Sequence, residues 1–298
     1  MRWVCILFPQ LALDAVLRQR PDPDEPLVLL NGPAQRRVLQ AVNPAARKLG
    51  LRPGQSMTAA QAMSKGFATA DYEAAEVEHW QQFLAAWAYR FSAQVSVHYP
   101  RTVVFEIESS LGLFGDWAQL EARLRAELDE LGFRHRIVAA PNPVAARILA
   151  NAYDGLVVPD DQALQRHLGP LPVDRIGLEA NVATALSRMG LRTLSQVQGL
   201  PRQSLARRFE AQVLKHLDAL LGLRRLALAF YLPPDRFDVL DLIDRVDDLQ
   251  EIGHIAGQCP QVGKNVSDRV VDLVRDPGRQ LADAGQLFGL DEIFVRAF

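Results

Sequence analysis

A chain of 298 residues is longer than one typical compact domain, so its length predicts two or more domains. Hydrophobic residues make up 49% and charged residues 23%, which indicates a packed core, and the formal net charge of −2 conceals an uneven distribution. Cys5 and Cys259 are the only cysteines, which excludes a disulfide framework or a cysteine-rich zinc cluster and fits a reducing compartment. The first apolar run is too short for a secretory signal, and no later segment approaches the length of a membrane span. We therefore expect a cytoplasmic protein with no membrane partner.

The first elements are predicted from short apolar runs. Residues 3–8 form a run ended by a proline, which predicts a buried strand, and residues 11–18 have helical spacing. The apolar runs 27–30 and 38–42 predict a pair of strands. Residues 43–63 contain two short helical pieces, an alanine-rich appendage to a larger domain.

The middle of the chain alternates helices and strands. An apolar stripe at spacings of three and four predicts one long helix, through Val77, Trp80, Leu84, Trp87 and Phe91. Strands over 95–99, 103–109 and 133–139 alternate with helices that begin at Asp116 and Asn142, both good N-caps. Strands that mix hairpins with helical crossovers predict an α+β fold, a mixed sheet layered with helices.

From about residue 160 the chain becomes helical and basic. Between Arg166 and Arg225 ten Lys and Arg residues stand against four acidic residues. A surplus of six positive charges in a small helical unit favours a phosphate-binding surface over an ordinary solvated face.

Two helix–glycine–helix corners lie within this basic segment. Gly190 follows one predicted helix, and Thr193 or Ser195 can cap the next, whereas the corner at Gly177 matches the pattern less well. Glycine permits a tight turn, so we expect Gly190 to present free backbone N–H groups to a phosphate oxygen. Such contacts bind the DNA backbone without reading its sequence. The candidate DNA-backbone-binding residues are Gly177, Gly190, Arg188, Arg192, Arg202, Arg207 and Arg208.

Two carboxylates, Glu106 and Glu108, flank Ile107 on a predicted strand, so both are expected on one face. Together they could bind one cation weakly, but they cannot form a two-metal site unaided. We favour a solvated position for Glu106 and a structural hydrogen-bonding role for Glu108. The six histidines are scattered without metal-ligand spacing, and neither a glycine-rich phosphate loop nor a nucleophile elbow occurs.

Four segments together resemble, in their order and spacing, the motifs of a known protein family. They are NPAARKLGLRPGQSMTAAQA, FEIESSLGLFG, AAPNPVAARILANA and MGLRTLSQVQGLPRQSLARRF. Over residues 3–228 the chain resembles the Y-family translesion DNA polymerases, and most closely the ImuB-type polymerase-like proteins. The resemblance implies a palm-like domain over 1–42 and 72–160, a small helical fingers-like region over 43–71, and a helix–hairpin–helix thumb over 161–230. Residues 231–298 are acidic, with thirteen acidic and seven basic residues from Asp235 onward, so a fourth domain (the little finger) is expected to be missing or truncated.

The resemblance also implies a set of site residues. Arg47 matches a triphosphate-binding arginine, and Arg147 stands where the family has a triphosphate-binding lysine. The family is expected to hold two Mg²⁺ ions with a first-strand aspartate and an Asp-Glu pair; here the degenerate positions are Leu7, Ile107 and Glu108. No carboxylate precedes Asp14, which lies well along the first helix. A two-metal mechanism needs several carboxylates, so we expect no catalytic residues and no cofactor.

The resemblance implies a non-catalytic protein of DNA repair. It would act in SOS-type error-prone translesion synthesis, binding damaged template–primer DNA and recruiting a separate error-prone polymerase, a sliding clamp and a RecA-like accessory protein. Two alternatives remain open. One is an active translesion polymerase with an altered metal site, which would need Mg²⁺, and the other is a helix–hairpin–helix DNA-binding assembly protein.

Overall fold

The computed structural model describes residues 2–233. Contacts divide the chain into one unit of residues 1–231 and a second of residues 232–298. The acidic C-terminal segment, and with it the expectation about a fourth domain, lies outside the described residues. None of the described helices is both long and apolar enough to cross a membrane.

The first unit alternates strands and helices along most of its length. Its strands are β1 (Trp3–Leu7), β2 (Leu27–Asn31), β3 (Val38–Val42), β4 (Ala68–Asp71), β5 (Val95–Ser96), β6 (Thr102–Glu106), β7 (Arg136–Ala140) and β8 (Leu156–Val157). Its α-helices are α1 (Leu11–Leu17), α2 (Pro44–Lys48), α3 (Met57–Met63), α4 (Ala74–Tyr89), α5 (Leu111–Phe114), α6 (Trp117–Glu130), α7 (Pro143–Ala150), α8 (Asp161–Leu168), α9 (Ala180–Arg188), α10 (Leu194–Gln198), α11 (Arg202–Arg208) and α12 (Ala211–Leu220). A 3₁₀ turn, η1 (Ala34–Arg36), separates β2 from β3.

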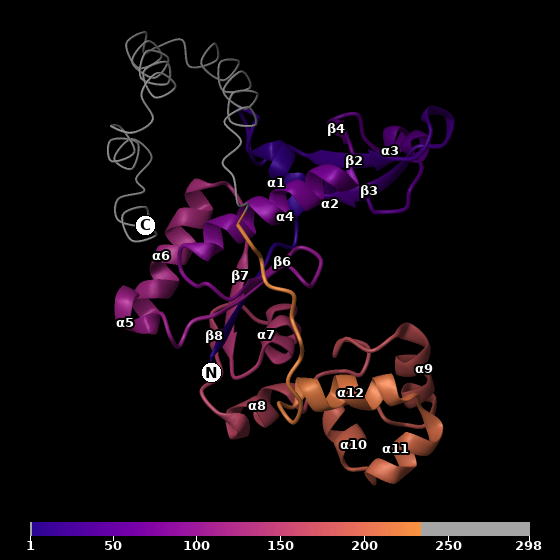
Figure 1. The fold of residues 1–298 in the computed structure, drawn as a ribbon. Helices are drawn as coiled ribbons and strands as arrows, with labels where there is room; N and C mark the ends of the chain where they lie inside the picture. The colour runs from indigo at the N-terminus through magenta and orange to yellow at the C-terminus, as the bar shows by residue number, and fades with distance from the viewer. Residues whose placement is uncertain (1, 234–298) are drawn as a thin grey trace, which may run out of the picture. The chain divides into compact units, whose positions relative to one another are not determined.

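A five-stranded sheet in the order β5-β6-β1-β7-β8 forms the larger layer (Figure 1). Its central strand β1 pairs antiparallel with both β6 and β7. Alternate side chains of β1 enter two different cores, because successive residues of a strand point to opposite faces. Cys5 and Leu7 pack towards α7, whereas Val4 and Ile6 pack towards α4 and α6. The all-apolar run of β1 is therefore explained by burial on both faces.

The predicted caps and helical stripe are confirmed. Asp116 accepts the N–H of Gln119 at the start of α6, and Asn142 accepts that of Ala145 at the start of α7. The apolar stripe of α4 packs on the sheet together with α6. These helices cover the face of the sheet opposite α7.

A second sheet, ordered β3-β2-β4, carries α2 and α3. β2 and β3 pair antiparallel as expected, and β4 joins β2 in parallel. The sequence places residues 1–42 with the palm-like domain, whereas in the structure β2 and β3 form a sheet with β4 that is separate from the larger sheet. Local apolar runs identify strands but cannot say which sheet they join, because β4 lies about forty residues downstream.

The helices α8 to α12 form the helical part that the sequence predicts as a thumb. Their apolar side chains belong to the same cluster as α7 and one face of the large sheet. Leu186, Leu194, Leu205 and Leu217 are buried in that cluster. The thumb is thus packed directly against α7.

Candidate functional site

Glu106 is buried, with only 3% of its surface exposed, so the expectation of a solvated side chain is wrong. Its carboxylate accepts the N–H of Glu108 at 2.8 Å and the hydroxyl of Ser109 at 2.7 Å. β6 ends at Glu106, and Glu108 is exposed in the turn that follows. The two carboxylates therefore do not share a strand face, because the period-two alternation stops at the turn.

The register of β1 and β6 separates the predicted degenerate positions. Leu7 lies opposite Thr102, whereas Glu106 lies opposite Trp3 at the other end of β1. Four residues of strand correspond to about 13 Å. Leu7 and Glu108 are consequently not brought together, although the sequence analysis placed them in one site.

The end of β1 at Leu7 is surrounded by basic side chains instead. Leu7 is flanked by Thr102 on one neighbouring strand and by Arg136 on the other. The backbone N–H of Phe8 donates to the carbonyl of Arg101 at 2.9 Å. Sequence reasoning missed Arg101 and Arg136, because their proximity to Leu7 is set by strand register rather than by a motif.

Arg147 also belongs to this end of the sheet. Its guanidinium carbon lies 5.0 Å from the ring centroid of Tyr99, in the loop before β6. Burial raises the pKa of the Tyr99 phenol, while the positive charge of Arg147 lowers it. Nδ2 of Asn151 donates to the carbonyl of Arg147, and Nη1 of Arg136 donates to the carbonyl of Asn151. Arg147 therefore sits at the C-terminal end of α7, linked to Arg136 through Asn151.

Among the described residues no group of three or more His, Cys, Asp and Glu side chains could hold a metal ion. Asp14, the first carboxylate of the chain, lies within α1 with 2% of its surface exposed. It forms an ion pair with Arg134.

Arg47 lies in a different basic setting. It is exposed on α2 and, with Lys48 and Arg52, lines a shallow pocket that Pro44 and Pro53 complete. Nη1 of Arg52 donates to the carbonyl of Arg47 at 3.0 Å. The pocket holds three cationic side chains and no carboxylate, so it suits an anion. Arg147 does not line it.

The corner at Gly190 does not present free N–H groups, contrary to expectation. Gly190 has φ +81° and donates to the carbonyl of Ser187, and the next residue, Leu191, donates to that of Leu186. This pair of bonds is a Schellman motif, which closes α9. Gln196 accepts the backbone N–H groups of Arg192 and Thr193 through Oε1. The backbone N–H groups of this corner are therefore already hydrogen-bonded in the caps of the two helices that it joins.

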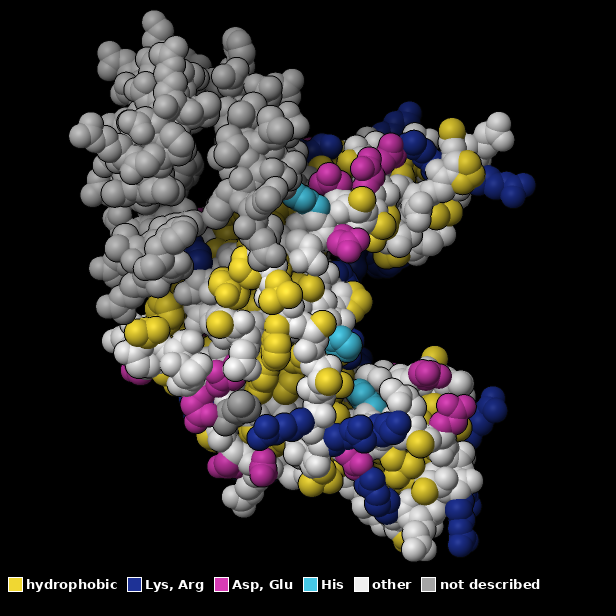
Figure 2. Space-filling view, in the orientation of Figure 1, with side chains coloured by type: hydrophobic (Ala, Val, Ile, Leu, Met, Phe, Trp, Pro, Cys, Tyr) yellow, Lys and Arg dark blue, Asp and Glu magenta, His cyan; other side chains and the backbone are white. Residues whose placement is uncertain are grey.

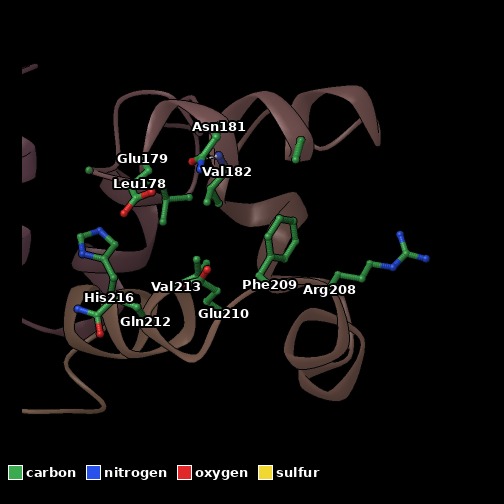
Figure 3. A pocket seen from close by; sticks show the side chains of 12 residues that line it. Leu178, Glu179, Asn181, Val182, Arg208, Phe209, Glu210, Gln212, Val213 and His216 are labelled. Carbon is green, nitrogen blue, oxygen red and sulfur yellow. Dashed lines mark hydrogen bonds between the residues drawn. The ribbon is translucent and has the colours of Figure 1, made fainter.

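The corner at Gly177 is the more open of the two. Gly177 has φ +83° and precedes α9, and the described residues provide no acceptor for the backbone N–H groups of residues 177–181. His216 of α12 is hydrogen-bonded through Nε2 to the carbonyl of Ile176 at 2.7 Å. A pocket of about 460 Å³ lies between this corner and α12 (Figure 3). Figure 3 shows Arg208 pointing away from the other labelled side chains, at the far end of the pocket from His216.

The predicted thumb arginines differ in their surroundings. Figure 2 shows Lys and Arg side chains gathered over the thumb helices. Arg202 forms a two-pronged ion pair with Asp218, with both N···O distances 2.6 Å. Arg208 contacts the sulfur of Met189. Arg188, Arg192 and Arg207 are exposed and take part in no ion pair among the described residues.

Comparison with solved structures defines the class of fold. DinB from Sulfolobus solfataricus superposes with a TM-score of 0.64 at 18% identity, covering 77% of this chain and 70% of that one. An insertion ternary complex of Dbh DNA polymerase gives a TM-score of 0.65 at 18% identity, covering 76% and 69%. The chain has the mixed α+β fold of a Y-family DNA polymerase.

Comparison with known sequences finds similarity to one protein family and to one group of curated relatives. Residues 12–151 match the model of the impB/mucB/samB family. Protein ImuB of Caulobacter vibrioides (strain NA1000 / CB15N) is 29% identical over 212 residues, which cover 71% of this chain and 46% of ImuB. The chain therefore spans about half the length of that relative. The resemblance to Y-family and ImuB-type proteins is confirmed.

Proposed function

We propose that this chain is a non-catalytic, polymerase-like protein that binds DNA and brings a separate polymerase to damaged template–primer DNA. The observation that carries the proposal is Leu7 at the end of β1, where the resemblance implies an Mg²⁺-binding aspartate. Leu7 is 8% exposed and belongs to the apolar cluster under α7. Its strand neighbours are Thr102 and Arg136, and a guanidinium repels a divalent cation.

The thumb supports the DNA-binding half of the proposal. The basic surplus of residues 166–225 and the open corner at Gly177 both suit phosphate, and phosphate contacts dominate the affinity of most DNA-binding proteins. The cationic pocket at Arg47 suits the phosphates of a nucleotide or of DNA. Arg147 is assigned here to the end of β1 rather than to a site shared with Arg47.

The likeness to ImuB supports the biological setting that we propose. The protein would act in SOS-type error-prone translesion synthesis in the cytoplasm, with a sliding clamp, a RecA-like accessory protein and an error-prone polymerase as partners. All of these belong to the proposal, because the chain matches 46% of ImuB.

Primer extension tests the absence of catalysis. Purified protein with a template–primer, all four nucleoside triphosphates and Mg²⁺ or Mn²⁺ should give no extended product, under conditions where an active Y-family polymerase extends the primer. Robust extension that disappears on Glu108→Ala would overturn the proposal in favour of an active enzyme with an altered metal site.

DNA binding has its own test. If six thumb residues contact phosphates, affinity for duplex DNA should fall about a thousandfold between 50 and 200 mM salt. Fluorescence anisotropy over that range measures the dependence. Binding that is absent, or that does not respond to salt, would remove DNA from the proposed function.

A further inference from the structure

Three arginines converge on the end of β1 at Leu7, and we call Arg101, Arg136 and Arg147 the palm arginine cluster. In the sheet, Leu7 pairs with Arg136 on one side and with Thr102 on the other. Arg101 directly precedes Thr102 in the chain. Paired residues of neighbouring antiparallel strands lie about 5 Å apart at their Cα atoms, so Thr102 and Arg136 are roughly 10 Å apart across Leu7. Exposed Arg101 and half-buried Arg136 therefore flank Leu7, and half-buried Arg147 lies against Tyr99 in the loop that carries Arg101.

Arg101 is held in a strained conformation. Its φ of +55° is the only positive φ of a non-glycine residue recorded in the described part of the chain. Such a conformation is unfavourable for a non-glycine residue, and strain of this kind concentrates at functional sites. Nη1 of Arg101 donates to the carbonyl of Pro9, which directs the side chain over the turn that follows β1.

Gln81 of α4 enforces this arrangement. Its Oε1 accepts the N–H of Arg101 at 3.3 Å, and its Nε2 donates to the carbonyls of Tyr99 at 2.6 Å and Thr102 at 3.0 Å. A side chain from a distant helix therefore fixes the loop that carries Arg101. The conformation of residues 99–102 is thus fixed by contacts within the protein and does not depend on a ligand.

The cluster is not neutralised within the described residues. No recorded ion pair includes any of its three guanidinium groups. Arg136 and Arg101 donate to backbone carbonyls, which carry no net charge. Arg147 is half-buried against the ring of Tyr99. Holding like charges together without a counter-charge is unfavourable, and an anionic ligand would relieve it.

We propose that the palm arginine cluster binds the phosphodiester backbone of DNA directly, at the end of β1 where the family resemblance implies metal ions. Arginine suits this ligand because its fork of N–H donors matches two phosphate oxygens. The inference rests on the proposed DNA-binding function and adds a second contact region to the thumb. In this protein positive side chains, and not cations bound by carboxylates, meet the phosphates at the palm.

The test compares two double variants that remove the same charge. Arg101→Gln with Arg136→Gln neutralises two members of the cluster without touching Arg147, which packs against the thumb corner. The matched control is Arg20→Gln with Arg123→Gln, two arginines engaged in ion pairs with Glu25 and Glu127. Thermal unfolding checks that both variants are folded. The affinity of each for duplex DNA is then measured between 50 and 200 mM salt.

The cluster variant should bind more weakly, and its slope of log affinity against log salt should be smaller than wild type by about 1.8, because each lost phosphate contact removes about 0.9. The control slope should equal that of wild type. A cluster variant with the wild-type slope would overturn the inference and leave the proposed function standing. Absence of DNA binding by the wild-type protein would overturn both.

A second arm separates DNA from free nucleotide. Binding of a nucleoside triphosphate without DNA is titrated in the same proteins. We expect the two palm substitutions to leave it unchanged. Loss of nucleotide binding with unchanged DNA affinity would overturn the assignment to DNA backbone and give the cluster to nucleotide phosphates.

Discussion

Asp14 and Arg134 form a buried link between α1 and the segment before β7. Oδ2 of Asp14 accepts the backbone N–H of Arg134 at 2.9 Å, and Oδ1 faces its guanidinium at 3.3 Å. Burial raises the pKa of Asp14 to about 7, although the hydrogen bond and the charge of Arg134 both lower it. The desolvation of the carboxylate is thus only partly offset by its partner.

Stability should fall as pH rises from about 4 to 7. In this range the unfolded chain, with an Asp14 pKa near 3.8, has released the proton that the folded chain still holds. The folded state binds more protons, so raising the pH favours unfolding. A shift of about 3 pKa units corresponds to a loss on the order of 4 kcal/mol in the free energy of unfolding. Urea unfolding at pH 4.5, 6 and 8 measures it.

The Asp14→Asn variant isolates this contribution from the other titrating groups. The difference in unfolding free energy between wild type and variant should shrink or reverse as pH rises. A difference that stays constant from pH 4.5 to 8 would show that Asp14 is ionised throughout.

The two thumb glycines provide a matched pair for backbone and packing effects. A Cβ at Gly177 would lie 3.0 Å from Cδ1 of Ile148 and 3.1 Å from Nη1 of Arg147, whereas a Cβ at Gly190 would meet no atom within 4 Å. Both glycines have positive φ, so alanine at either position should cost about 1–2 kcal/mol. Gly177→Ala should cost about 1–3 kcal/mol more, because the side chains of Ile148 and Arg147 on α7 must shift to admit the methyl group.

Equilibrium unfolding of the two variants measures this difference. Equal destabilisation would mean that the thumb corner is not packed on α7 as the structure describes. Since α7 also carries Arg147, Gly177→Ala should weaken DNA binding as well as stability.

Patterns within a few neighbouring residues predict the helices and strands of this fold more reliably than they predict which strands pair with one another. Asp116 and Asn142 begin helices because a side-chain oxygen within three residues accepts an orphan N–H, a purely local event. The stripe of α4 is equally local. The pairing of β2 with β4 depends on residues forty positions apart, and no motif in either strand specifies it.

The candidate site was predicted less well for the same reason. Register decides that Leu7 faces Thr102, and that register is set partly by Gln81, which holds the preceding loop from another helix. Family resemblance directed attention to Glu108, which lies near the opposite end of β1. The loop between the two predicted strands, which contains Arg101, was visible in the sequence. Its place beside Leu7 was not.

Glu106 should be important for stability. Its buried carboxylate accepts the hydroxyl of Ser109 and the backbone N–H of Glu108, which holds the turn after β6. Glu106→Ala removes a buried acceptor and both of its hydrogen bonds, so the unfolding free energy should fall by about 2–3 kcal/mol. Ser109→Ala removes one donor only and should cost about 1 kcal/mol. Denaturant unfolding compares them, and a Glu106→Ala protein as stable as wild type would contradict the role of this carboxylate.

Charge pairing within the thumb should divide its arginines into two groups. Arg202 is held by both carboxylate oxygens of Asp218, so its charge is already compensated within the protein, whereas exposed Arg192 takes part in no recorded ion pair of the described residues. Arg192→Gln should therefore reduce the salt slope of DNA binding by about 0.9, the value for one lost phosphate contact. Arg202→Gln should change that slope much less. Anisotropy titrations of the two single variants against the same duplex measure the contrast. A larger effect at Arg202 would mean that DNA displaces Asp218 and that this ion pair opens on binding.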